Sequence, residues 1–269
     1  MNQDAVKAML LDIRECALDF SVIFTGKASK KVNGLYNLQT FQILLHTKNF
    51  ATDNELVYTA IHEYTHHLQN EARSVMRNSG GAPCARHHTT SFWALFHELL
   101  EIAEKKGVYK LHNEPNDELA NLTDEIRTKY IAQNGVLIKE LGKLLLKAHA
   151  LCDAAHIRFE DYIDRELCLP RQAARTIAKI ATYDISPDLG YERMKITAGI
   201  ANAEKRAKTE SMLLAGKSPD FVRYASRTKS ENENVDPKEK LLSEKKRIEK
   251  TIEQLTQRLK YVEENLAVL

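Results

Sequence analysis

The 269-residue sequence predicts an α+β fold: a small unit of one helix, three strands and a long helix, then a mainly helical region and a C-terminal coiled coil. Three observations support this prediction. Apolar residues alternate in short N-terminal stretches, recur at helical spacing over most of the remaining chain, and repeat every seven residues near the C-terminus. The length also exceeds that of a typical single domain, so we expect more than one domain.

The N-terminal elements follow from local patterns. Residues 2–17 have the amphipathic pattern of a helix. Residues 19–24 alternate as a strand that ends at Gly26, and residues 32–46 have the pattern of a hairpin that turns near residues 38–40. These segments predict one helix packed on a small sheet.

The next helix carries the most informative motif of the chain. Thr52 and Glu55 form a capping-box pattern that predicts where this helix begins. The motif His-Glu-x-x-His follows at residues 62–66, so His62 and His66 leave one face of the helix and can bind one metal ion. Glu63 is then placed to act on a water molecule at that ion, which is the layout of a zinc hydrolase.

A catalytic zinc ion usually has three protein ligands and one open position, so a third ligand is needed. Residue types alone leave several downstream candidates open, namely His87, His88, His97, Glu98 and Glu101.

The run of residues 88–96 resembles the second motif of SprT-like and related minimal zincin peptidases, where a histidine four residues before an aromatic completes the metal site. The hairpin and motif helix also match that family in order and spacing, so the resemblance covers about residues 1–107. One departure is Thr89, at a position where the family often has glycine. The resemblance implies a zincin-like fold, a Zn²⁺ cofactor, three ligands and a general base: His62, His66 and His88 with Glu63. His87 is the fallback ligand, and Glu98 comes after it.

The resemblance also implies how a peptide substrate binds. In related zincins an extended peptide pairs with an edge strand over the cleft, which assigns residues 41–46 as the track. The oxyanion-stabilising group stays open among His87, His67 and Tyr36. Residues 73–86 are expected to form a loop between the first two ligands and the third.

Composition limits the remaining classes. The net charge is +2, no run approaches a membrane span, and no positively charged start precedes an apolar stretch, so we expect a cytoplasmic protein without a membrane partner. Cys16, Cys84, Cys152 and Cys168 are irregularly spaced, which favours free thiols. Cys84 precedes the predicted third ligand, so its role stays open.

The downstream sequence is helical and divides at polar stretches. We expect a domain over residues 1–113, a helical domain over residues 114–225, a linker over residues 226–235 and a coiled coil over residues 236–269. In the coiled coil, apolar residues fall at a and d positions, interrupted by one lysine. The apolar positions are Leu241, Ile248, Ile252, Leu255, Leu259, Val262, Leu266 and Leu269. A parallel homodimer is our first interpretation, and an antiparallel hairpin with another helix of the chain is the alternative.

Residues 159–180 resemble a helix-turn-helix segment of bacterial DNA-associated proteins, with a turn at Leu169 and Pro170. The DNA-facing set on the second helix is Arg171, Gln172, Arg175 and Lys179. Charge weakens this interpretation, because residues 158–229 hold fourteen basic and ten acidic residues. A protein-interaction or regulatory helical module is therefore the alternative.

Two functions follow from these patterns. The first is a zinc metallopeptidase that hydrolyses peptide bonds of intracellular proteins, with the helical half supplying targeting. The second is a non-catalytic, zinc-containing regulatory or DNA-binding protein that acts through its helical half. Glu63 favours the first, because a structural zinc site needs no general base.

Overall fold

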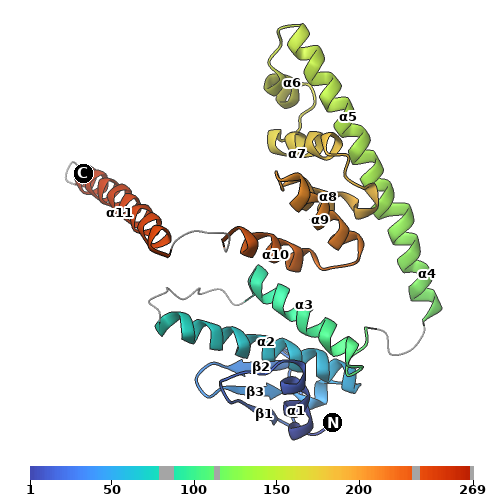
Figure 1. The fold of residues 1–269 in the computed structure, drawn as a ribbon, viewed down its shortest axis with the longest axis vertical. Coiled ribbons are helices and arrows are strands. Elements are labelled where there is room, and N and C mark those ends of the chain that lie inside the picture. The colour runs from blue at the N-terminus through green and yellow to red at the C-terminus, as the bar shows by residue number, and fades with distance from the viewer. Residues whose placement is uncertain (79–87, 112–115, 232–236, 267–269) are drawn as a thin grey trace. The chain divides into compact units, whose positions relative to one another are not determined.

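The computed structural model describes residues 1–78, 88–111, 116–231 and 237–266 (Figure 1). The chain divides into two compact units, Met1–Tyr224 and Ala225–Leu269. The first unit contains a three-stranded sheet and most of the helices, which confirms the α+β class. The finer domain boundaries and the coiled coil stay predictions. No helix in the described ranges is both long and apolar enough to cross a membrane.

The N-terminal part of the first unit contains the sheet and three helices. Its elements are α1 (Gln3–Ile13), β1 (Ser21–Phe24), β2 (Gly34–Asn37), β3 (Gln42–Leu45), the short η1 (Thr47–Asn49), α2 (Asp53–Asn78) and α3 (Thr90–Lys105). The predicted helix, strand and hairpin are therefore confirmed in order and type.

The sheet order is β1-β3-β2. β1 pairs parallel with β3, and β2 pairs antiparallel with β3, so β3 is the central strand. The prediction that residues 41–46 form an edge track is therefore wrong, because neighbouring strands already occupy both sides of β3. The hairpin turns where Asn37 Oδ1 accepts hydrogen bonds from the backbone nitrogens of Gln39 and Thr40.

The ends of α1 and α2 differ from the predicted ones, and contacts with α2 explain the end of α1. α1 ends at Ile13, four residues early, because the following turn is held by α2: Tyr64 donates its hydroxyl hydrogen to the carbonyl of Arg14, and the Glu71 carboxylate accepts from the nitrogen of Ala17. α2 continues to Asn78, so residues 73–78 are helix and not loop. The helix-breaking glycines begin only at Gly80.

The core of this part lies between the sheet and the three helices. α1 contributes Leu10, the central strand contributes Ile43, α2 contributes Ile61 and α3 contributes Phe92 and Phe96, all fully buried. The apolar face of α2 is therefore packed into this core. The packing holds the histidines beside that face at a fixed orientation.

The remaining elements are helical. In chain order they are α4 (Asp117–Glu125), η2 (Ile126–Ala132), α5 (Gln133–Ala154), α6 (Phe159–Arg165), α7 (Arg171–Thr182), η3 (Pro187–Leu189), α8 (Gly190–Ala198), α9 (Ala203–Leu214), α10 (Pro219–Glu231) and α11 (Pro237–Leu266). α7 packs closely on α5, because a Cβ at Gly142 would lie 2.5 Å from the carbonyl oxygen of Ile177. The two helices predicted within residues 159–180 are present as α6 and α7, and their likeness to a helix-turn-helix segment stays a prediction.

Candidate metal centre

Three histidines converge at one point on the surface of α2. His62 and His66 lie one helical turn apart, with ring centroids separated by 5.2 Å. The Nε2 atom of His88 lies 3.2 Å from the Nε2 atoms of both. The structure therefore brings together the three residues that the sequence and the family resemblance selected.

His88 is held in place by the start of α3. The next residue, Thr89, is the N-cap, and its hydroxyl accepts a hydrogen bond from the nitrogen of Phe92 at 3.3 Å. Its φ of −86° is open to any residue, so this turn does not require the glycine of the family pattern. The fallback ligand His87 and the thiol of Cys84 lie outside the described residues. Glu98 forms an ion pair with Arg14.

The donor set fits a tetrahedral zinc ion. Two nitrogen ligands at a Zn–N distance of about 2.0–2.1 Å lie about 3.3–3.4 Å apart, close to the observed 3.2 Å. Burial and the neighbouring His88 lower the pKa of His62 to about 4, so its imidazole is neutral at pH 7 and keeps a free electron pair. Metal ligation requires that neutral form.

Aromatic rings surround the histidines. The Phe92 ring centroid lies 4.5 Å from that of His66 and 4.8 Å from that of His88. Trp93 stacks on His88 at 5.6 Å, and Phe96 contacts the edge of His62 at 5.5 Å. These rings fix the imidazole orientations and exclude water from one side of the cluster, which strengthens electrostatic interactions there.

Glu63 is buried beside β2, with 7% of its surface exposed. Burial raises the pKa of its carboxyl group to about 7, although the backbone N–H of Tyr36 donates a hydrogen bond to it and opposes the rise. β2 approaches this closely because residue 34 is glycine: a Cβ there would lie 2.9 Å from Cγ of Glu63 and 2.9 Å from Cγ2 of Thr59. A pKa near neutrality suits a group that accepts and returns a proton.

Sequence reasoning missed the roles of Gly34 and the Tyr36 backbone. A glycine that opens a predicted strand was the available signal, because such a residue often marks a close backbone approach.

A buried hydrogen-bond network holds β2 against α2. His67 Nε2 lies 2.9 Å from the carbonyl oxygen of Leu18, so this nitrogen carries the hydrogen. His67 Nδ1 then accepts from the Tyr36 hydroxyl at 3.0 Å, and Asn70 donates to the same hydroxyl at 3.2 Å. The donors of both predicted oxyanion candidates, His67 and Tyr36, are therefore engaged in this network. The oxyanion-stabilising group among His87, His67 and Tyr36 stays a prediction.

A second group of potential ligands, Cys16, His67 and Glu71, lies at the far side of this network. Its polar atoms already bind the turn after α1. The Cys16 thiol donates to the Leu18 carbonyl oxygen, and the Glu71 carboxylate accepts from backbone nitrogens of the same turn. The group is therefore a hydrogen-bonded clamp between the turn and α2.

The predicted DNA-facing set is exposed on α7 but partly neutralised. Arg171 donates from Nε to the Asp164 carboxylate at 2.8 Å, and Arg175 lies 3.6 Å from the Glu160 carboxylate. Both acids belong to α6, so the arginine charges face partners within the protein. Gln172 and Lys179 are exposed on the same helix. DNA contact by these four residues stays a prediction.

Comparisons with known proteins give no family assignment: no family model, no curated protein and no solved structure matches this chain.

Proposed function

We propose that this protein is a zinc-dependent metallopeptidase of the SprT-like, minimal zincin type, which hydrolyses peptide bonds of intracellular proteins. One observation carries the proposal: the Nε2 atom of His88 lies 3.2 Å from those of both His62 and His66, and the residue that follows His62 in the chain is a buried glutamate, Glu63. Three imidazoles and a carboxyl group with a raised pKa form the donor set and the base that metal-assisted hydrolysis needs.

His62, His66 and His88 would hold the ion. When bound, zinc supplies Lewis-acid polarisation of a carbonyl and makes water at its open position more acidic. Glu63 would accept the proton of the attacking water and pass it to the leaving amine, since its pKa of about 7 allows both steps near neutral pH. The Tyr36 N–H orients this carboxylate from β2.

The edge strand β2 is the proposed track for an extended substrate. β2 ends the sheet, whereas β3 has partners on both sides. β2 comes close to Glu63 at Gly34, where an added Cβ would lie 2.9 Å from Cγ of Glu63, so a peptide that pairs with β2 is brought next to the general base. The track replaces the one expected over residues 41–46.

The test is zinc-dependent hydrolysis by the purified full chain against a mixture of fluorescence-quenched peptides. Removing zinc should abolish hydrolysis, and adding zinc back should restore it. Glu63→Gln should keep one zinc per chain and the thermal unfolding midpoint but lower kcat/KM by roughly 10²–10⁴-fold, because the amide cannot take a proton. The matched control is Glu98→Gln, which changes a surface carboxylate paired with Arg14.

Unchanged turnover in Glu63→Gln would contradict the proposed role of this residue. Full zinc occupancy with no hydrolysis by the unmodified protein would favour the non-catalytic regulatory alternative.

A further inference from the structure

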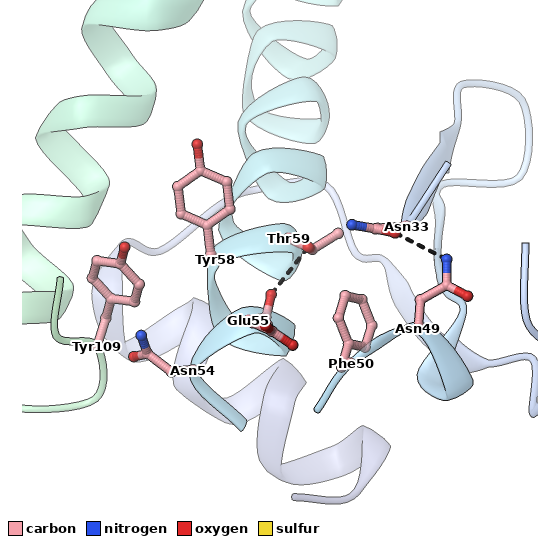
Figure 2. Close-up of a pocket in the computed structure, with 8 residues that line it drawn as sticks. All are labelled: Asn33, Asn49, Phe50, Asn54, Glu55, Tyr58, Thr59 and Tyr109. Carbon is pink, nitrogen blue, oxygen red and sulfur yellow. Dashed lines mark hydrogen bonds between the residues drawn. The ribbon is translucent and has the colours of Figure 1, made fainter. Parts of the chain in front are cut away.

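A cavity of about 280 Å³ lies one helical turn before the metal centre on α2 (Figure 2). Its volume lies just below the roughly 300–1,000 Å³ range of small-molecule sites, so it has room for one side chain and not for a folded partner. Its walls come from the strand β2 region, η1, the first turns of α2 and the segment after α3. The lining residues are Asn33, Asn49, Phe50, Asn54, Glu55, Tyr58, Thr59 and Tyr109.

Two contacts join this cavity to the proposed catalytic residues. Thr59, which lines the cavity, and Glu63 both lie next to Gly34 on the proposed substrate track, since a Cβ added there would be 2.9 Å from each side chain. Tyr58 lies edge-on to Phe96 at 5.2 Å, and Phe96 in turn contacts His62 at 5.5 Å. A side chain that leaves a peptide on β2 near the scissile bond can therefore reach the cavity.

The asparagines that line the cavity are occupied by structural hydrogen bonds. Asn49 donates to Asn33 Oδ1 at 2.9 Å and to the Ser29 carbonyl oxygen at 2.7 Å. Asn54 makes a two-way contact with the backbone of Lys110, at 2.7 and 3.0 Å. These bonds make the walls rigid and leave recognition to the remaining side chains.

The Thr59 hydroxyl donates to the backbone carbonyl oxygen of Glu55, and the other remaining side chains are a carboxylate and aromatic rings. One oxygen of Glu55 accepts from the nitrogen of Ala51 at 2.7 Å, and no ion pair of this carboxylate occurs within the described ranges. The Tyr58 and Tyr109 rings lie 6.1 Å apart, and Figure 2 draws Glu55 between this pair and Phe50. The eight described lining residues include no lysine, arginine or histidine. The cavity therefore carries one negative charge next to π-faces, which together attract a cation.

We propose that this cavity binds a basic side chain of the peptide substrate, and arginine in preference to lysine. A planar guanidinium can stack on a tyrosine ring and donate to Glu55 at the same time, whereas an ammonium is a more strongly hydrated point charge. An acidic side chain would be repelled by Glu55, and an apolar one would remove water from this carboxylate without replacing its hydrogen bonds. This inference rests on the proposed peptidase function.

The binding test does not depend on catalysis. The full chain carrying Glu63→Gln, loaded with zinc, is titrated with N-acetyl-arginine amide and with its neutral isostere N-acetyl-citrulline amide. The ring signals of labelled Tyr58 and Tyr109 are followed by NMR. The arginine compound should shift both signals with at least about tenfold higher affinity than the citrulline compound, since only the former carries the charge.

The decisive variant is Glu55→Gln in the same background. Its amide oxygen still accepts from Ala51, so the start of α2 is kept while the charge is lost. The preference for arginine over citrulline should fall to about twofold or less, whereas Glu98→Gln should leave it unchanged. Equal affinities for the two compounds in the parent protein, or an unchanged preference in Glu55→Gln, would overturn the proposal.

A second measurement uses hydrolysis. Peptides that differ only in arginine, citrulline, leucine or glutamate beside the scissile bond should be cleaved fastest with arginine, and Glu55→Gln should remove that advantage through KM. Cleavage that is indifferent to this residue would also overturn the proposal. Absence of hydrolysis for every peptide, with arginine-selective binding retained, would instead reject the peptidase function and leave the cavity assignment supported.

Discussion

Two long helices, α2 and α11, have the same kind of amphipathic sequence but differ in what covers their apolar face. In α2, Ala60, Ile61 and Tyr64 are fully buried by the sheet and the neighbouring helices. In α11, the heptad residues with described side chains remain about half exposed, with values of 50% for Ile248, 58% for Ile252, 61% for Leu255 and 58% for Leu259.

The difference between α2 and α11 shows what a periodic sequence predicts about a helix and what it does not predict. Periodicity specifies which face of a helix is apolar, but it does not specify the partner that covers that face. α2 finds its partners within the first unit, and this burial fixes the direction in which His62 and His66 point. The α11 seam belongs to the second unit, where its described residues stay about half exposed, and we predict that another helix covers it.

The largest expected effect is on zinc binding at the histidines beside the buried face of α2. His88→Ala should lower zinc affinity by at least about 100-fold, because it removes a direct ligand, and loss of groups that merely orient ligands already costs about 10–100-fold. Zinc content by elemental analysis and competition with a chelator measure the effect. The control is His97→Ala, which changes a histidine on α3 beside Trp93 and outside the convergent cluster.

A second variant, His87→Ala, tests whether His87 is the third ligand instead of His88. Retained zinc in His88→Ala together with lost zinc in His87→Ala would move the third ligand by one residue. The assignment of His62, His66 and Glu63 would remain.

The next effect concerns pH and the metal-free protein. The Glu63 pKa rises from 4.5 to about 7 on folding, so between these values the folded state holds a proton that the unfolded state has lost. Its contribution to stability is therefore complete below pH 4.5 and is lost as the pH rises through 7, by roughly 3 kcal/mol in total. His62 contributes the opposite slope, because burial lowers its pKa to about 4.

The difference in unfolding free energy between the parent protein and Glu63→Gln separates the contribution of Glu63 from that of His62. Urea unfolding of the chelator-treated chain and of Glu63→Gln should show the variant gaining stability relative to the parent as the pH rises from 5 to 8. A constant difference across this range would contradict the burial of an ionisable Glu63. Glu98→Gln serves again as the surface control.

Much of the metal centre could be predicted because its geometry is local. His62 and His66 share one helix face, and their spacing alone puts them together, as the hairpin pattern of residues 32–46 put β2 beside β3. Contacts between distant segments could not be read from spacing. The central position of β3, the Tyr36 N–H at Glu63 and the pairing of Arg171 with Asp164 each depend on how separate elements pack.

The smallest effect on catalysis is expected from α11. Removing residues 236–269 should leave peptide hydrolysis unchanged within about twofold, since no ligand, base or lining residue of the cavity lies there. It should nevertheless halve the mass measured by light scattering, because the exposed seam predicts a parallel homodimer through a and d positions.

A point variant distinguishes the seam from the rest of the helix. Ile252→Glu together with Leu259→Glu should dissociate the dimer by placing charges at two a positions, whereas Glu249→Gln with Glu253→Gln should not. A loss of only the mass of the 34 deleted residues, with the number of chains per particle unchanged, would favour the antiparallel hairpin within one chain. The hairpin predicts a different result for the intact protein. Its Leu255 side chain should be protected from solvent even at protein concentrations too low for a dimer to form. A cysteine at position 255 would then react slowly with a thiol reagent at every protein concentration, whereas a homodimer predicts reaction that accelerates on dilution.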